Sequence, residues 1–240
     1  MAAISKDTFF NGRLIITQPL KGYRYAIDAI LLAAAIRPQK GETVIDLGTG
    51  CGIIPLILAT RHPGIHIAGV EIQEELALLA QRNVVDNGYE ASVAIRNIDL
   101  NMLPDHETTG PFDWVVSNPP YRRPGTGRIN PIRQKALARF EIKVDLAQLL
   151  QSAEKLLRAG GRFVTIFTAE RMVDLIVQMR KTEIEPQSIQ AVQSHRGEVA
   201  KLVLVKGTKG GRTGLCIDAP LVVYEQDGSY TEAVEIMMQP

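Results

Sequence analysis

The chain has 240 residues, and its 27 Lys and Arg against 26 Asp and Glu give a net charge of +1. This balance excludes a general electrostatic attraction to nucleic acid, so any such attraction must come from local clusters. With 45% hydrophobic and 22% charged residues, the composition is typical of a soluble globular protein. The longest apolar runs, such as AILLAAAI, are too short to span a bilayer, and the first ten residues lack the charged-then-apolar pattern of a signal peptide. Two cysteines, Cys51 and Cys216, make no disulfide framework, which indicates a cytoplasmic protein with reduced thiols.

The N-terminal stretch predicts a hairpin followed by a helix. TFFNGRLIITQP is apolar on both sides of Asn11-Gly12, a dipeptide typical of a type I′ turn. DAILLAAAIRP follows, with Asp28 as a candidate N-cap and Pro38 beyond the expected end of the helix.

Strands and helices alternate from residue 43 onward. The expected strands are TVIDLG (43–48), IHIAGVE (65–71), SVAIRNID (92–99), FDWVVSN (112–118) and RFVTIFT (162–168). The expected helices are IIPLILATR (53–61), EELALLAQRNVVDNG (74–88, ended by Asn87-Gly88), DLAQLLQSAEKLLRAGG (145–161, capped by Asp145 and ended by Gly160-Gly161) and ERMVDLIVQMRK (170–181). This alternation indicates a parallel sheet with helices on both faces.

The last third of the chain changes character. IQAVQS and KLVLVKG are joined by only HRGEVA, which is too short for a helical crossover, so these two strands should be antiparallel. LVVYEQDGSYTEA reads as a small hairpin around Asp227-Gly228. The sequence therefore predicts an α/β fold, a Rossmann-like doubly wound sheet of seven strands with an antiparallel last strand and small β additions at both ends. We expect a single domain, 1–240, with a hairpin and helix (1–40), a catalytic core (41–208) and a C-terminal β extension (209–240).

The stretch VIDLGTGCGIIPL runs from a strand through a glycine loop into a helix. Its glycines fall at 48, 50 and 52, so it departs from the dinucleotide fingerprint, and the Gly-Lys-Ser/Thr of a phosphate loop is absent. Glycines let a ligand approach the backbone, and N–H groups at a helix start favour an anionic group such as a carboxylate. The loop is therefore either a cofactor site or simply a tight strand-to-helix turn.

Acids end the next two strands. Glu71 comes about 20 residues after the loop, where a carboxylate can accept both hydroxyls of a ribose. It could also be a helix-start charge, although Glu74 and Glu75 fit that role better. Asp99 could accept the amino group of an adenine or be an ordinary loop carboxylate. With the glycine loop, Glu71 and Asp99 should line one crevice at the carboxyl edge of the sheet.

A further polar stretch, SNPPY (117–121), follows the apolar run FDWVV. DLGTGCG, VE, NID and NPPY, in this order, resemble the class I S-adenosylmethionine-dependent methyltransferases, and SNPPY narrows the resemblance to enzymes that methylate a planar nitrogen. KGYRYAIDAILLAAA before the loop and ALARFE after NPPY are similar to the bacterial tRNA adenine-N6 methyltransferase group, over roughly residues 8–230. The resemblance implies S-adenosylmethionine as the cofactor and these contacts to it: Lys21, Tyr23, Tyr25, Asp46, Gly48, Thr49, Gly50, Cys51, Gly52, Glu71, Ile72, Ile98, Asp99 and Asn118.

The chemistry of an adenine amine explains what SNPPY would do. The lone pair of this amine is delocalised into the ring, so the site must favour a pyramidal nitrogen. The Asn118 side-chain oxygen and the Pro119 carbonyl can each accept one N–H, Pro119 and Pro120 stiffen the loop, and Tyr121 offers a face for the base. A strand terminator is the simpler interpretation of the same residues. No metal is needed, and the two histidines four residues apart, His62 and His66, flank Pro63-Gly64, which disrupts the helix that metal ligands at this spacing would need.

The segment 122–143 carries seven basic residues against one acid, Glu141. Such a run is usually a solvated face, but its place directly after NPPY favours contact with RNA phosphates. The expected substrate contacts are Tyr121, Arg122, Arg123, Arg128 and Arg133.

The sequence thus predicts an adenine-N6 methyltransferase acting on RNA, most simply tRNA. A protein glutamine-N5 methyltransferase is the nearest alternative because it uses the same NPPY chemistry, and a nucleobase in DNA is a third possible substrate. A non-catalytic, cofactor-binding RNA module is also conceivable, although the intact Asn118 and Tyr121 argue against it. The oligomeric state is left open.

Overall fold

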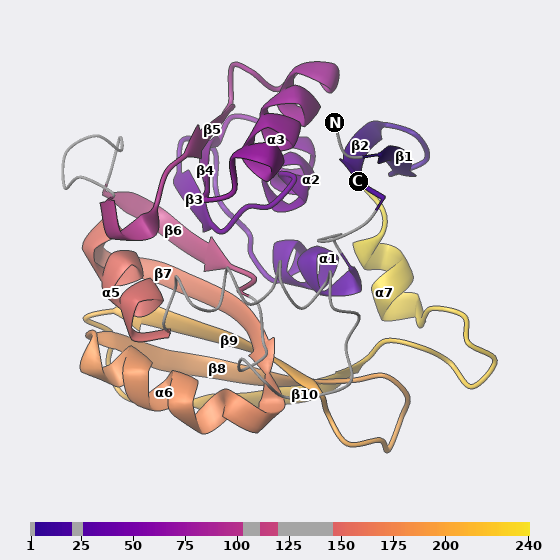
Figure 1. Cartoon of the computed structure of the whole chain (residues 1–240). Helices are drawn as coiled ribbons and strands as arrows, with labels where there is room; N and C mark the ends of the chain where they lie inside the picture. Colours follow the sequence, from indigo (N-terminus) through magenta and orange to yellow (C-terminus); the bar gives the residue numbers. More distant parts are fainter. Residues whose placement is uncertain (1–2, 21–25, 103–110, 120–145) are drawn as a thin grey trace.

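The structure is a computed structural model that describes residues 3–20, 26–102, 111–119 and 146–240. Its centre is an eight-stranded sheet (Figure 1) built from β3 (Thr43–Leu47), β4 (His66–Glu71), β5 (Val93–Asn97), β6 (Phe112–Ser117), β7 (Leu157–Thr168), β8 (Ile184–Gln193), β9 (Leu202–Lys209) and β10 (Cys216–Val222). The spatial order is β10-β8-β9-β7-β6-β3-β4-β5.

All neighbouring pairs in this sheet are parallel except those of β9, which runs antiparallel to both β7 and β8. The Rossmann-like arrangement with an antiparallel seventh strand is therefore confirmed. The eighth strand, β10, was not expected. It pairs with β8 at the edge of the sheet, and most of its side chains are exposed, so it lacks the apolar pattern that marks a buried strand.

Helices cover both faces of the sheet (Figure 1): α1 (Ile27–Ala34), α2 (Ile53–Arg61), α3 (Glu74–Asp86), α5 (Leu146–Leu156), α6 (Met172–Lys181) and α7 (Glu232–Met237). Residues of α1, α2, α3 and α7 pack with Val44 and Val116 in one core, whereas α5 and α6 pack with Ile45 and Val115 in a second core. Successive strand residues point to opposite faces, so one apolar strand serves both cores.

The clearest differences from the expected helix boundaries are at α1 and α5. Ala26, not Asp28, occupies the N-cap of α1, and the Asp28 carboxylate accepts the Ala29 N–H within the first turn. Helix α5 ends at Leu156, and β7 begins at the next residue, where Leu157 pairs with Phe112. The Gly160-Gly161 pair thus lies inside β7 beside a register shift, a typical place for glycine in a strand. Asp145 lies outside the described residues.

The expected N-terminal hairpin is present as β1 (Ile4–Phe9) and β2 (Leu14–Pro19). Its loop has four residues instead of two, with left-handed φ angles of 51°, 54° and 84° at Phe10, Asn11 and Gly12. The expected C-terminal hairpin is reduced to one bridge between Tyr224 and Tyr230. The helix α7 follows where a purely β extension had been expected.

Candidate active site

Strand register brings the predicted site residues to one edge of the sheet. Leu47 pairs with Val70, so the next residues, Gly48 and Glu71, lie level at the carboxyl ends of β3 and β4. On the other side of β3, Asp46 pairs with Val116 in β6. Asn118, two residues further, is therefore level with the start of the glycine loop.

The glycine loop adopts a conformation that requires its glycines. Gly48, Gly50 and Gly52 have φ angles of 81°, 58° and 84°, a region that other residues rarely adopt. The N–H groups of Gly48 and Thr49 both donate to the Val70 carbonyl at 2.9 Å, and the Gly52 N–H donates to the Thr49 carbonyl at 2.9 Å. The loop is thus a tight turn held against β4. A fixed loop of this kind is compatible with both interpretations, the strand-to-helix turn and the cofactor site.

Glu71 braces this loop. Its side chain is 2% exposed; Oε2 accepts the Gly50 N–H and Oε1 accepts the Gln73 N–H, each at 2.9 Å. Burial raises the pKa of the Glu71 carboxyl, and the hydrogen bonds from Gln73 and Gly50 oppose that rise. Each carboxylate oxygen keeps a second lone pair, so Glu71 can still accept ribose hydroxyls.

Asp46 is the most unusual carboxyl in the described part of the chain. It is fully buried, and neither oxygen has a hydrogen-bond partner of normal geometry there. Burial raises the pKa of Asp46 to about 7, the nearby Thr49 hydroxyl opposes the shift, and the charge of Glu71 adds to it. A buried carboxylate in this state fits a cationic ligand group, such as the ammonium of a cofactor that ends in an amino acid.

Gly69 was missed by the sequence analysis. A Cβ at this position of β4 would lie 2.6 Å from Ile95 Cδ1 and 3.0 Å from Thr49 Oγ1. The missing side chain therefore makes room for Thr49, which is 3% exposed within the glycine loop. A glycine inside an apolar strand, as in IAGVE, is the signal that could have revealed this close approach.

Two buried hydroxyls fix the strand end that precedes Asn118. Ser117 Oγ donates to the Leu47 carbonyl at 2.8 Å, and Thr165 Oγ1 donates to the Ser117 carbonyl at 2.8 Å. These bonds link β3, β6 and β7 at the carboxyl edge. Asn118 and Pro119 follow directly, and both are half-buried.

The end of β5 lies beside Glu71. The Ile98 N–H and the Asn97 side-chain amide both donate to the Glu71 carbonyl, at 3.2 and 2.8 Å. Asp99 is half-buried, and its carbonyl accepts the Met102 N–H. Ile72 and Ile98 are also half-buried at this edge, and the role of Asp99 toward an adenine amino group stays a prediction.

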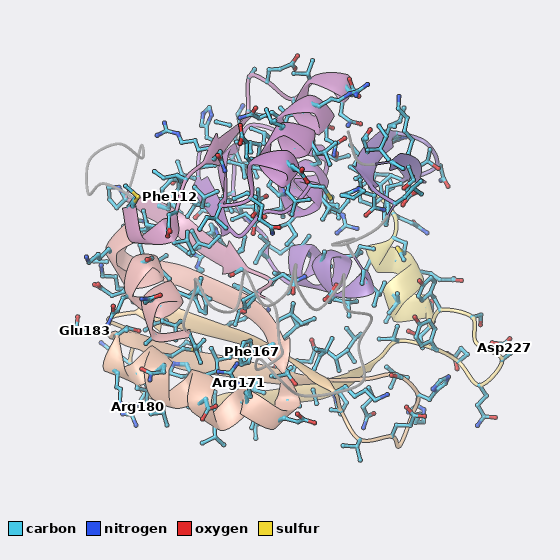
Figure 2. The ribbon with its side chains drawn as sticks, viewed as in Figure 1. Phe112, Phe167, Arg171, Arg180, Glu183 and Asp227 are labelled. Carbon is cyan, nitrogen blue, oxygen red and sulfur yellow. The ribbon has the colours of Figure 1, made fainter. Side chains whose placement is uncertain are left out.

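The remaining predicted residues are Lys21, Tyr23, Tyr25, Pro120, Tyr121, Arg122, Arg123, Arg128 and Arg133, and they lie outside the described residues. Among the described residues, Arg171 is a cation at the carboxyl edge. Arg171 follows β7, and its guanidinium is 5.4 Å from the centre of the Phe167 ring (Figure 2).

A hollow of about 310 Å³ lies at the opposite edge of the sheet, lined by Arg37, Pro38, Gln39, Lys40, Arg61, His62 and Pro63. Its arginines are engaged by the backbone: Arg37 donates to the carbonyls of Ala34 and Ile36, and Arg61 donates to that of Gln239. Because its lining residues precede β3 and β4, whereas the glycine loop follows β3, this hollow is separate from the loop. Among the described residues there is no group of three or more His, Cys, Asp or Glu arranged for a metal, and no helix long and apolar enough to cross a membrane.

The glycine loop and the acid that ends the next strand are common to Rossmann-like folds, and the antiparallel seventh strand, β9, gives this sheet the arrangement of the Rossmann-like methyltransferases. The chain belongs to the methyltransferase small domain family, whose pattern matches residues 26–185. The family resemblance seen in the sequence is therefore confirmed.

Curated relatives match over most of the chain. A tRNA1(Val) (adenine(37)-N6)-methyltransferase from Proteus mirabilis is 28% identical over 235 residues, covering 96% of this chain and 91% of the relative. One from Porphyromonas gingivalis is 30% identical over 192 residues, 74% of each chain. The crystal structure of a predicted O-methyltransferase from Agrobacterium tumefaciens matches with a TM-score of 0.67 at 23% identity, over 88% of this chain and 94% of the other. At that identity, the likeness shows the fold.

Proposed function

We propose that this chain is an S-adenosylmethionine-dependent methyltransferase that transfers a methyl group to the exocyclic N6 amine of an adenine in tRNA. The observation that carries the proposal is the level placement of the glycine loop and Asn118 at one sheet edge. Donor and acceptor sites would then be adjacent. The names of the curated relatives favour adenine in tRNA over other planar nitrogens.

The described residues fit the cofactor. The N–H groups of Gly48, Thr49, Gly50 and Gly52 already donate to protein acceptors. The amino-acid end of the cofactor would therefore be held through its ammonium, by Asp46. Glu71 would accept the ribose hydroxyls, and Asp99 the adenine amino group. When bound, the cofactor supplies a methyl group already activated by its sulfonium, so the protein's main task is alignment.

The chain's own residues would prepare the amine. The Asn118 Oδ1 and the Pro119 carbonyl would each accept one N–H of the amine, which favours a pyramidal nitrogen and stabilises its developing positive charge. The hydroxyls of Ser117 and Thr165 hold the strand end and so limit reorganisation of these acceptors. Tyr121 would stack on the base, and the basic segment 122–143 would contact phosphates.

The test is methyl transfer from cofactor carrying a labelled methyl group to total bacterial tRNA, total protein or DNA, with Asn118→Ala as the inactive control. Digestion to nucleosides and mass analysis should reveal label in N6-methyladenosine from tRNA alone. Label in N5-methylglutamine, recovered after proteolysis without acid, would instead assign the protein substrate. Label in DNA adenine would assign DNA. Activity on tRNA also fits the cytoplasm, where we place the protein.

A further inference from the structure

Asn83 in α3 and Asn87, the C-cap residue directly after this helix, bind the backbone of β2. Asn83 Oδ1 accepts the Thr17 N–H at 2.8 Å, and its Nδ2 donates to the Thr17 carbonyl at 2.9 Å. Asn87 Oδ1 accepts the Ile15 N–H at 2.8 Å, and its Nδ2 donates to the Ile15 carbonyl at 2.8 Å. Each amide therefore satisfies the strand backbone as a neighbouring strand would.

The two asparagines differ in one further contact. Asn83 Nδ2 also donates to the Cys51 carbonyl, at 2.9 Å, whereas the additional bond of Asn87 Nδ2 goes to the Asn83 carbonyl of its own helix, at 2.7 Å. Asn83 is fully buried. It is thus a direct link between the N-terminal hairpin and the glycine loop.

With this contact, the glycine loop is hydrogen-bonded to side chains on two sides. Glu71 holds the Gly50 N–H from the side of β4, and Asn83 holds the Cys51 carbonyl from the side of α3. The following residue, Gly52, is also close to α3, because a Cβ there would lie 3.2 Å from the Ala80 Cβ. A loop with three glycines has many accessible conformations when unrestrained, so fixed partners on both sides limit it to one.

We propose that Asn83 is a positioning residue that holds the glycine loop in its ligand-binding conformation and couples that conformation to the docked hairpin. The identity of the ligand, S-adenosylmethionine, rests on the proposed function. An amide suits the position because it accepts one bond and donates two; a carboxylate of the same shape accepts but cannot donate.

The first experiment reads the loop without any cofactor. Cys51 is buried within the loop, whereas Cys216 is exposed, so in a Cys216→Ser background a thiol reagent reports opening of the loop. Asn83→Asp should raise the rate of Cys51 modification about tenfold. Loss of one buried hydrogen bond should increase the population of the open loop by about that factor, and the thiol reagent reacts with the open loop. Asn87→Asp is the control for the contact with β2, because it removes the same amide donor, at a half-buried position, without touching the loop. Its rate should stay within about twofold of the parent, and Asn83→Ala, measured beside it, removes the contact with the loop without adding a buried charge.

The second experiment is calorimetric titration with S-adenosylmethionine. Asn83→Asp should weaken binding about tenfold and Asn87→Asp less than about twofold, while turnover of both at saturating cofactor stays near that of the parent. If Asn83→Asp does not fold, Asn83→Ala takes its place in both measurements. Unchanged Cys51 reactivity in a folded Asn83 variant, or equal effects of the two asparagine substitutions, overturns the proposal. Failure of the parent protein to bind the cofactor overturns the proposed function instead, and the thiol rates still decide the role of Asn83.

Discussion

At the scale of single residues, Asp46 links binding to stability. Its ordinary pKa is 3.8, and burial raises it to about 7 in the folded chain. Between these values the folded state keeps a proton that the unfolded chain releases, so the free energy of unfolding falls as pH rises from about 4 to about 7 and is level above that. A cation bound to Asp46 would favour the ionised carboxylate. It would thereby restore part of the free energy of unfolding that is lost as the pH rises.

Asp46→Asn should therefore stabilise the protein without cofactor and weaken cofactor binding. The gain in free energy of unfolding should be larger at pH 8 than at pH 5, by roughly 2 kcal/mol, because the buried charge is present only at the higher pH. Urea denaturation at the two pH values measures it. An equal gain at both would show that Asp46 does not titrate in this range.

The same carboxyl should make cofactor binding depend on pH. If the ammonium of S-adenosylmethionine meets Asp46, binding lowers the pKa of that carboxyl and releases a proton, and affinity rises as pH goes from 5.5 to 7. Calorimetry in buffers of different ionisation enthalpy counts the protons released. Asp46→Asn should abolish this release, and a wild-type chain that releases none would contradict the contact.

Asn118 is the residue on which the chemistry depends. Asn118→Ala should lower turnover by about 10²–10³, as expected for loss of one preorganised stabilising group, with little change in cofactor affinity. Single-turnover methyl transfer, with cofactor affinity measured in parallel, separates the two effects. Near-normal turnover of this variant would favour the simpler interpretation, in which SNPPY only terminates the strand.

Local sequence was enough to place some of these residues but not others. The glycine loop and Glu71 could be predicted because a strand, a glycine turn and a helix are consecutive in the chain. Asn83 could not, since its partners Thr17 and Cys51 lie 66 and 32 positions away and only the fold brings them together. Gly69 differs, because a glycine inside an apolar strand is a local signal, but its neighbours Ile95 and Thr49 belong to other segments and only the fold identifies them.

At the scale of secondary-structure elements, a strong apolar pattern determined what could be predicted. Helix α2 spans the predicted residues, 53–61, between a left-handed glycine and a His-Pro-Gly turn. The boundary between α5 and β7 was misplaced by five residues, because pairing of Leu157 with Phe112 extends the strand through the glycine pair. The short elements β10 and α7 have too few buried residues, Leu221 and Val234 among them, to show a period.

Close approach between elements predicts the effect of filling Gly69. Gly69→Ala should reduce the free energy of unfolding by about 1–3 kcal/mol, since the new methyl group would overlap Ile95 Cδ1 and press on Thr49. Adding Ile95→Val removes the nearest atom and should recover part of the loss. A double-mutant cycle in urea measures the coupling. Additive effects of the two substitutions would mean that β4 and β5 adjust without strain.

At the scale of the whole molecule, the net charge is close to zero, but acidic and basic residues are unevenly distributed along the chain. Residues 213–240 include five acids and no base, whereas residues 122–143 include seven bases and one acid. A phosphate backbone should therefore contact the protein near the SNPPY strand end and be repelled by the C-terminal segment. This asymmetry is what makes nucleic acid compatible with a net charge of +1.

The salt dependence of tRNA binding tests that distribution. If Arg128 and Arg133 each contact a phosphate, replacing both with Ala should flatten the log–log salt slope by about two contacts, at roughly 0.7–0.9 each, and weaken binding to all tRNAs alike. Replacing Arg82 and Arg180 removes the same charge from α3 and α6, where both pair with carboxylates, and should leave the slope unchanged. Fluorescence titration across a range of salt concentrations distinguishes the two pairs. Equal flattening of the slope by both pairs would mean that only the net charge of the protein matters. If the parent protein does not bind tRNA, the glutamine amide of a protein becomes the favoured substrate.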